Sequence, residues 1–226
     1  MRDYLSGSGL VWVALGFSIL VALNLITLAL GPAQVLANLA TRPWGAFVSV
    51  FVFDSWGTAG GLVGVVVLFT PLLFGVPRAQ RARLSAFFLA ASVIVGVTAN
   101  VLWTDLYNDT GFIGSGSSSI AFAAQAIIFT LSIFGLVSLV RGRSLSYDPE
   151  TRAMRQFFTV VYITLILSTL YLVLVLQPIF TPTTLYNWRV HEIGFIMGIG
   201  ATFLYQAAPG GLTINLVPSS RPNQPK

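Results

Sequence analysis

Six long apolar runs constrain this sequence more than any other feature, because each is long enough to cross a lipid bilayer. About 20 apolar residues span the hydrocarbon core as a helix. Runs of that length lie at 10–30, 46–74, 84–103, 115–140, 157–178 and 188–208. Only 8% of the residues are charged, against roughly 25% in a soluble domain, so the exterior is expected to face lipid. We therefore predict an all-α membrane protein with six transmembrane helices.

The basic residues predict which side of the membrane each loop faces, since Lys and Arg in short loops stay on the cytoplasmic side. With the N-terminus inside, ten of the twelve Lys and Arg lie in inner segments, and only Arg42 and Arg189 lie in outer ones. This distribution predicts a multi-pass protein of the cell membrane with both termini in the cytoplasm. Residues 1–208 are expected to form one membrane domain, and 209–226 a disordered cytoplasmic tail.

Composition also narrows the classes of partner and cofactor. The net charge of +5 is spread over short loops rather than gathered on one face, so nucleic acid is not an expected partner. The chain has no Cys, which excludes disulfides, thiolate metal sites and a cysteine nucleophile. No metal or other cofactor is predicted, and the lipid bilayer is the first partner.

Two polar clusters fall at membrane depth, where polar groups are costly and mark candidate sites. One is the Gly- and Ser-rich stretch 114–119 at the outer end of the fourth run, and the other is 188–198, which opens the sixth run and holds the single His. Ser118 and His191 are each expected about one turn inside the outer end of their helix, roughly 4–6 Å deep. A hydrogen bond between them is therefore geometrically possible.

Small residues favour close approach of these two helices. Gly194 and Gly198 form a small-xxx-small stripe on the sixth run, and Ala121 and Ala124 are expected to face it from the fourth.

The chemistry of the pair has two interpretations. A serine hydroxyl becomes a nucleophile when a base takes its proton, and neutral imidazole suits that task near pH 7. Because no carboxylate is placed beneath the ring, Ser118 and His191 would act as a dyad. Alternatively, a Ser-rich helix start provides N-cap hydrogen bonds, and a lone interfacial His faces water.

Three ordered landmarks resemble the rhomboid family of intramembrane serine proteases, from about residue 42 to 205. Arg42-Pro43-Trp44 with Phe47 and Phe51 resembles the family's Pro-Trp start of the second helix. Gly116-Ser117-Ser118-Ser119 stands in the place of its Gly-x-Ser-Gly. His191-Glu192-Ile193-Gly194-Phe195 with Gly198 is similar to its His-x-x-Gly segment.

The resemblance implies a six-helix rhomboid-like bundle that cleaves single-span membrane proteins near the outer face. Ser118 would be the nucleophile and His191 the general base, with Gly116 supporting the serine. Phe122 stands where the family often has an aromatic ring packed on the catalytic His.

The sequence departs from the family where the second helix usually carries a His and an Asn for the oxyanion. Counted from Pro43-Trp44, these places hold Thr58, which offers only a hydroxyl, and Leu62, which cannot donate. Losing one oxyanion donor typically costs about 10²–10³ in rate. Ser119 also replaces the usual Gly and is expected to hinder close packing. Two alternatives follow: an inactive rhomboid-like protein that binds transmembrane segments, or a structural subunit of a membrane complex.

Overall fold

The structure is a computed structural model that describes residues 8–42, 44–52, 56–76, 78–106, 117–141, 149–176 and 185–208. These ranges contain helices joined by turns and no strand, so the fold is all-helical, as predicted. The long helices are α1 (Ser8–Leu30), α4 (Trp56–Phe74), α5 (Arg78–Leu106), α6 (Ser118–Arg141), α7 (Pro149–Tyr171) and α9 (Leu185–Ala207). The short elements are α2 (Pro32–Ala40), α3 (Gly45–Ser49) and the π-helix η4 (Leu172–Leu176), which continues α7.

Five of the described helices are long and apolar enough to cross a membrane, which indicates a multi-pass integral membrane protein. They are Gly9–Leu30, Gly57–Phe74, Gln80–Asp105, Ser118–Arg141 and Arg152–Leu174. The helix α9 has 23 residues but is not among them, and its first turns carry Arg189, His191 and Glu192. The sixth span predicted at 188–208 therefore stays a prediction.

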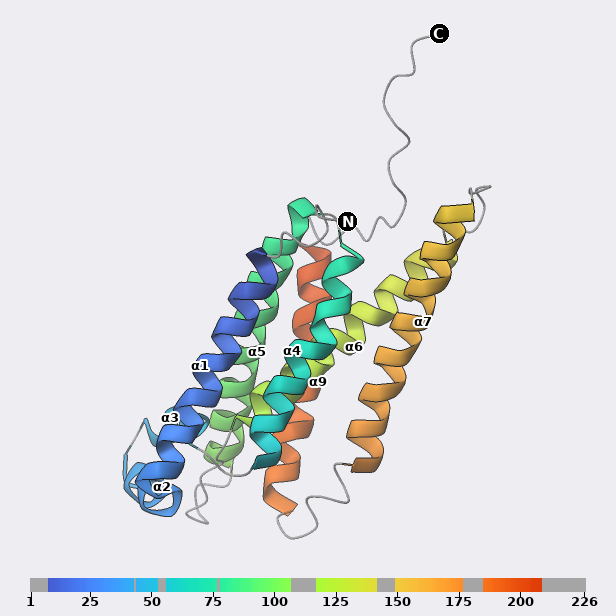
Figure 1. The fold of residues 1–226 in the computed structure, drawn as a ribbon. Helices are drawn as coiled ribbons and strands as arrows, with labels where there is room; N and C mark the ends of the chain where they lie inside the picture. The colour runs from blue at the N-terminus through green and yellow to red at the C-terminus, as the bar shows by residue number, and fades with distance from the viewer. Residues whose placement is uncertain are drawn as a thin grey trace.

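The long helices run side by side in alternating directions (Figure 1), with α1, α5 and α7 pointing one way and α4, α6 and α9 the other. Helix α6 is the most enclosed of the candidate spans, with 67% of its apolar window buried against 22% for α1 and for α7. It packs against α4, α5, α7 and α9. The residues at the start of α6 are thus surrounded by several helices.

The second apolar run is not one helix, so the prediction of a single helix over 46–74 was wrong. Helix α3 ends at Ser49 and α4 begins at Trp56. Asn100 of α5 holds α3 in place, because its Nδ2 donates to the carbonyl of Ala46 at 2.7 Å and to the Ser49 hydroxyl at 3.1 Å. The Trp44 and Phe47 landmark therefore belongs to a separate short helix docked on α5.

A sharp turn joins α1 to the short helices. Gly31 has φ of +84°, a conformation that favours glycine, and Pro32 then starts α2, where its missing N–H costs nothing. Gly45 is equally constrained, since a Cβ there would clash with the carbonyl oxygen of Leu39. These glycines let α2 and α3 fold against each other beside the end of α1.

Candidate functional site

Ser118 and His191 meet, as the sequence predicted. The Nε2 atom of His191 lies 2.7 Å from the Oγ atom of Ser118, although the residues are 73 positions apart. Ser118 is partly buried and His191 is 7% exposed. The distance is within hydrogen-bond reach for a nucleophile and its base.

The predicted depths of the two residues were wrong. Ser118 is the first residue of α6, and His191 lies six residues after the start of α9 at Leu185, about 9 Å along the axis. They reach one level because α9 begins before residue 188, where the apolar run starts. Leu185, Tyr186 and Asn187 extend this helix beyond the apolar run, which hydropathy alone does not detect.

Phe122 packs on the imidazole, as expected. The two rings are stacked, with their centroids 4.4 Å apart and an angle of 9° between their planes. Phe122 lies four residues after Ser118, hence on the same face of α6. The same side of α6 therefore supplies the Ser118 hydroxyl, which contacts the edge of the His191 ring, and the Phe122 ring, which stacks on the imidazole plane.

The acidic neighbour of His191 is directed elsewhere. Glu192 forms an ion pair with Arg189 at 2.9 Å, with side chains 34% and 52% exposed. A pair so accessible to solvent contributes little to stability, and it engages the carboxylate away from Ser118. Within the described ranges, no group of three His, Asp or Glu side chains is placed to hold a metal ion.

The seam of small residues between α6 and α9 exists, but its predicted partners were wrong. A Cβ at Gly194 would lie 3.1 Å from the carbonyl oxygen of Ser119, and a Cβ at Gly198 would lie 2.7 Å from that of Ala123. Ala121 instead faces α4, 3.8 Å from the Cβ position of Gly61. The stripe that meets α9 is 119, 123 and 126, which follows the helical period from Ser119.

Ser119 does not keep the helices apart, contrary to expectation. It is 1% exposed, and its carbonyl oxygen is the atom that approaches Gly194. Its hydroxyl is buried without a hydrogen-bond partner, an uncommon and costly state. The Ser119 side chain thus fits at this contact, with its hydroxyl left unsatisfied.

Thr58 reaches the level of the pair through the packing of α4 on α6. The two helices run in the same direction (Figure 1), and Gly61 is opposite Ala121. Thr58 lies three residues before Gly61, and Ser118 lies three residues before Ala121. Because the helices are parallel, Thr58 and Ser118 are at the same level along the helix axes. Thr58 is 6% exposed, and its role at an oxyanion stays a prediction. Gly116 lies outside the described residues.

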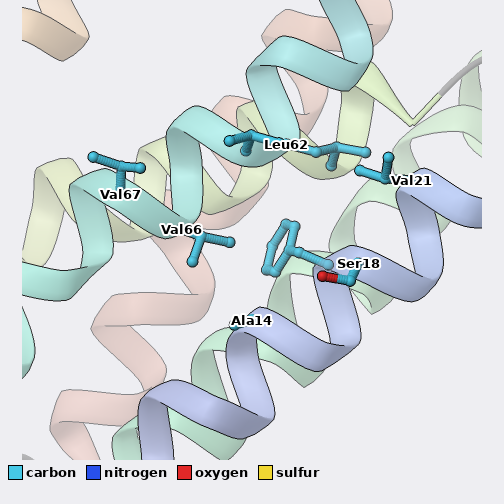
Figure 2. Close-up of a pocket in the computed structure, with 8 residues that line it drawn as sticks. Ala14, Ser18, Val21, Leu62, Val66 and Val67 are labelled. Carbon is cyan, nitrogen blue, oxygen red and sulfur yellow. The ribbon is translucent and has the colours of Figure 1, made fainter.

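Leu62 lines an apolar groove between α4 and α1, of about 240 Å³. Figure 2 shows Leu62, Val66 and Val67 of α4 across from side chains of α1. The lining residues all come from these two helices: Ala14, Phe17, Ser18, Val21, Leu62, Val63, Val66 and Val67. Leu62, which stands where the resemblance places a second oxyanion donor, thus packs toward α1.

Ser117 is a residue of this site to which sequence reasoning gave no role. Its hydroxyl donates to the carbonyl of Val50 at 2.9 Å and accepts from Nδ2 of Asn24 at 2.8 Å. Asn24 of α1 thereby bonds the residue that precedes α6. The sequence could have indicated this contact, because an Asn near the C-terminal end of the first run needs a polar partner at its own level.

Comparisons of the chain with protein families, with curated proteins and with solved structures found no match. The likeness to rhomboid proteases therefore rests on the three landmarks of the sequence. Function has to be inferred from the chemistry of the Ser118–His191 pair and its surroundings.

Proposed function

We propose that this chain is a rhomboid-like intramembrane serine endopeptidase that cleaves single-span membrane proteins near the outer face. The observation that carries the proposal is the 2.7 Å distance between His191 Nε2 and Ser118 Oγ. Stacking of Phe122 on the imidazole supports it, because a general base has to keep its ring oriented toward the nucleophile.

The chemistry follows from these positions. With its proton on Nδ1, the imidazole accepts the Ser118 proton at Nε2 while Oγ forms a bond to the carbonyl carbon of the scissile peptide. His191 then gives that proton to the leaving amine as the C–N bond breaks, which leaves an acyl group on Ser118. Water, deprotonated by the same imidazole, hydrolyses this ester and restores the serine hydroxyl.

Stabilisation of the oxyanion is the weaker part of the site. Ser118 is the first residue of α6, and the N–H groups of a first helical turn have no partner within their helix, so they favour negative charge. Thr58 adds a hydroxyl at the same level, whereas Leu62 adds no donor. We therefore expect a slow enzyme, since each missing donor costs about 10²–10³ in rate.

Six transmembrane helices are part of the proposal. The 23 residues of α9 extend about 35 Å at 1.5 Å per residue, which exceeds the roughly 30 Å of the hydrocarbon core. Its small-residue seam packs closely on the enclosed helix α6. Both features support α9 as the sixth span, with His191 in its outer part.

Labelling with a fluorophosphonate probe tests the enzyme proposal. The purified wild-type protein should react, Ser118→Ala should not react, and His191→Ala should react at least about 10² times more slowly, the low end of what a general base contributes. Ser132→Ala is a matched control, because Ser132 is buried on the same helix and its hydroxyl donates to the carbonyl of Ile128 within that helix. Equal labelling of wild type, Ser118→Ala and His191→Ala would rule the enzyme out.

A second candidate is a rhomboid-like protein that binds transmembrane segments without cutting them. Leu62 favours it, being 0% exposed and unable to donate a hydrogen bond. Because Leu62 packs toward α1, the substitution Thr58→His, which adds a donor at the level of the pair, should then create cleavage of a model single-span substrate that the wild type leaves intact. Cleavage by the wild type would eliminate this candidate.

A further inference from the structure

A buried chain of hydrogen bonds ends beside the nucleophile. Asn24 of α1 donates through Nδ2 to the Ser117 hydroxyl, and Ser117 donates to the carbonyl of Val50, directly after α3. Asn24 is 1% exposed, and Ser117 and Val50 are 0% exposed. Three elements far apart in the sequence thus meet at the residue before Ser118.

Ser117 occupies the N-cap position of α6, since its carbonyl accepts the first helical hydrogen bond from the amide of Ala121 at 3.0 Å. A serine at this position usually turns its hydroxyl to the first-turn amides of its own helix. Here the hydroxyl bonds two other elements. The bonds therefore link the start of α6 to α1 and to the end of α3.

The remaining sides of this first turn are held by close backbone contact. A Cβ at Gly96 of α5 would lie 2.6 Å from the backbone of Ile120, and one at Gly194 of α9 would lie 3.1 Å from the Ser119 carbonyl. These contacts limit movement of α6 toward α5 and α9. The Asn24–Ser117 pair supplies the directional restraint from α1.

We propose that Asn24 and Ser117 are positioning residues, which hold the first turn of α6 so that the Ser118 hydroxyl stays within reach of His191. The expected effect on reaction rate rests on the proposed protease function, whereas the expected effect on the Ser118–His191 hydrogen bond does not. A misplacement of about 1 Å at a reacting group can cost about 10² in rate. Loss of either partner also removes a buried hydrogen bond between elements. Nδ2 of Asn24 would keep its bond to the Leu20 carbonyl of its own helix at 2.6 Å, and Ser117 its bond to Val50 at 2.9 Å, so the turn would lose its restraint from α1.

The kinetic test compares fluorophosphonate labelling rates of Ser117→Ala, Asn24→Val and the double variant, at a temperature where all remain folded. Each single variant should react about 10 to 100 times more slowly than wild type. The double variant should be no slower than the worse single one, because both changes break the same contact. Ser132→Ala should keep the wild-type rate within about twofold, as expected for a substitution distant from the site.

A second readout does not depend on reactivity. The chain has one His, so protein with ¹⁵N-labelled histidine gives imidazole signals from His191 alone. Ser118→Ala should shift the Nε2 resonance by removing its hydrogen-bond partner, and Ser117→Ala and Asn24→Val should shift it in the same direction. Ser132→Ala should leave the resonance in place.

The two readouts separate failure of the protease function from failure of this inference. An unreactive wild type whose Nε2 resonance still shifts in Ser117→Ala and Asn24→Val would refute the protease and support the positioning role. An unshifted resonance in both variants would overturn the positioning role, whether or not the wild type reacts.

Discussion

At the scale of single residues, the imidazole of His191 is restrained in two ways. Ser118 fixes one ring nitrogen through a hydrogen bond, and Phe122 covers one ring face. A single hydrogen bond leaves the ring free to tilt about its contact, whereas a parallel ring at 4.4 Å fixes the plane as well. A base that takes a proton from Ser118 and passes it to a leaving amine needs both restraints.

Phe122→Ala should therefore slow the reaction while leaving both catalytic groups in place. We expect the fluorophosphonate labelling rate to fall about tenfold, a fraction of the roughly 10²–10⁴ that a positioned general base contributes. Phe129→Ala is the matched control, because Phe129 lies on the same helix and contacts α9 through Phe195, 6.0 Å between centroids. Equal rates for the two variants would show that stacking on His191 has no part in reactivity.

At the scale of elements, the seam between α6 and α9 determines whether the pair can meet. The two helices approach so closely at Gly198 that a Cβ would lie 2.7 Å from the carbonyl of Ala123 and 2.8 Å from the Cβ of Ala126. Rigid backbone cannot yield as a flexible side chain does. A larger residue must push the helices apart or shift α9 along its axis.

Gly198→Ala should accordingly destabilise the protein, by about 1–3 kcal/mol for an overpacked contact, and slow labelling of Ser118. Gly200→Ala provides the control, since Gly200 is on the same helix and a Cβ there meets nothing within 4 Å. Helix propensity favours Ala over Gly by up to about 1 kcal/mol, so Gly200→Ala should not lose stability. Thermal unfolding in detergent measures both variants, and a matching loss in the two would contradict tight packing at Gly198.

Sequence reasoning predicted the apolar helices and the meeting of Ser118 with His191, but not how helix faces and ends are arranged. Hydropathy locates an apolar run, yet it does not define the ends of the helix, as the start of α9 at Leu185 illustrates. The short helix α3, which ends before α4, is bonded by Asn100, a residue distant in sequence. Likewise Ala121 and Ala123 are equally small, and only packing decides that Ala123 meets Gly198.

At the scale of the whole molecule, the distribution of apolar surface agrees with a bilayer environment. Large hydrophobic side chains are exposed on several helices, including Trp12, Val67, Leu174 and Leu204. An apolar surface of that extent on a soluble monomer would be an aggregation hazard, whereas lipid is its natural solvent. Few charges and an apolar exterior thus have the same cause, which explains why composition alone predicted the membrane.

The charge distribution predicts the membrane topology, and the absence of Cys makes this prediction directly measurable. Three single-cysteine variants place a thiol in one predicted outer segment, Asn108→Cys, and in two inner segments, Ser146→Cys and Ser220→Cys. A membrane-impermeant maleimide should label Asn108→Cys in intact cells. The other two should react only after permeabilisation, because Lys and Arg retain their loops on the cytoplasmic side.

The two inner positions also test whether α9 crosses the bilayer. Residues 146 and 220 are separated by α7 and α9, so they share a side only if both helices cross or neither does. If only α7 crosses, Ser220→Cys should react in intact cells while Ser146→Cys does not. That result would leave five spans and would remove His191 from a membrane-crossing helix, whereas protection of both thiols supports the six-helix bundle that the proposed protease requires.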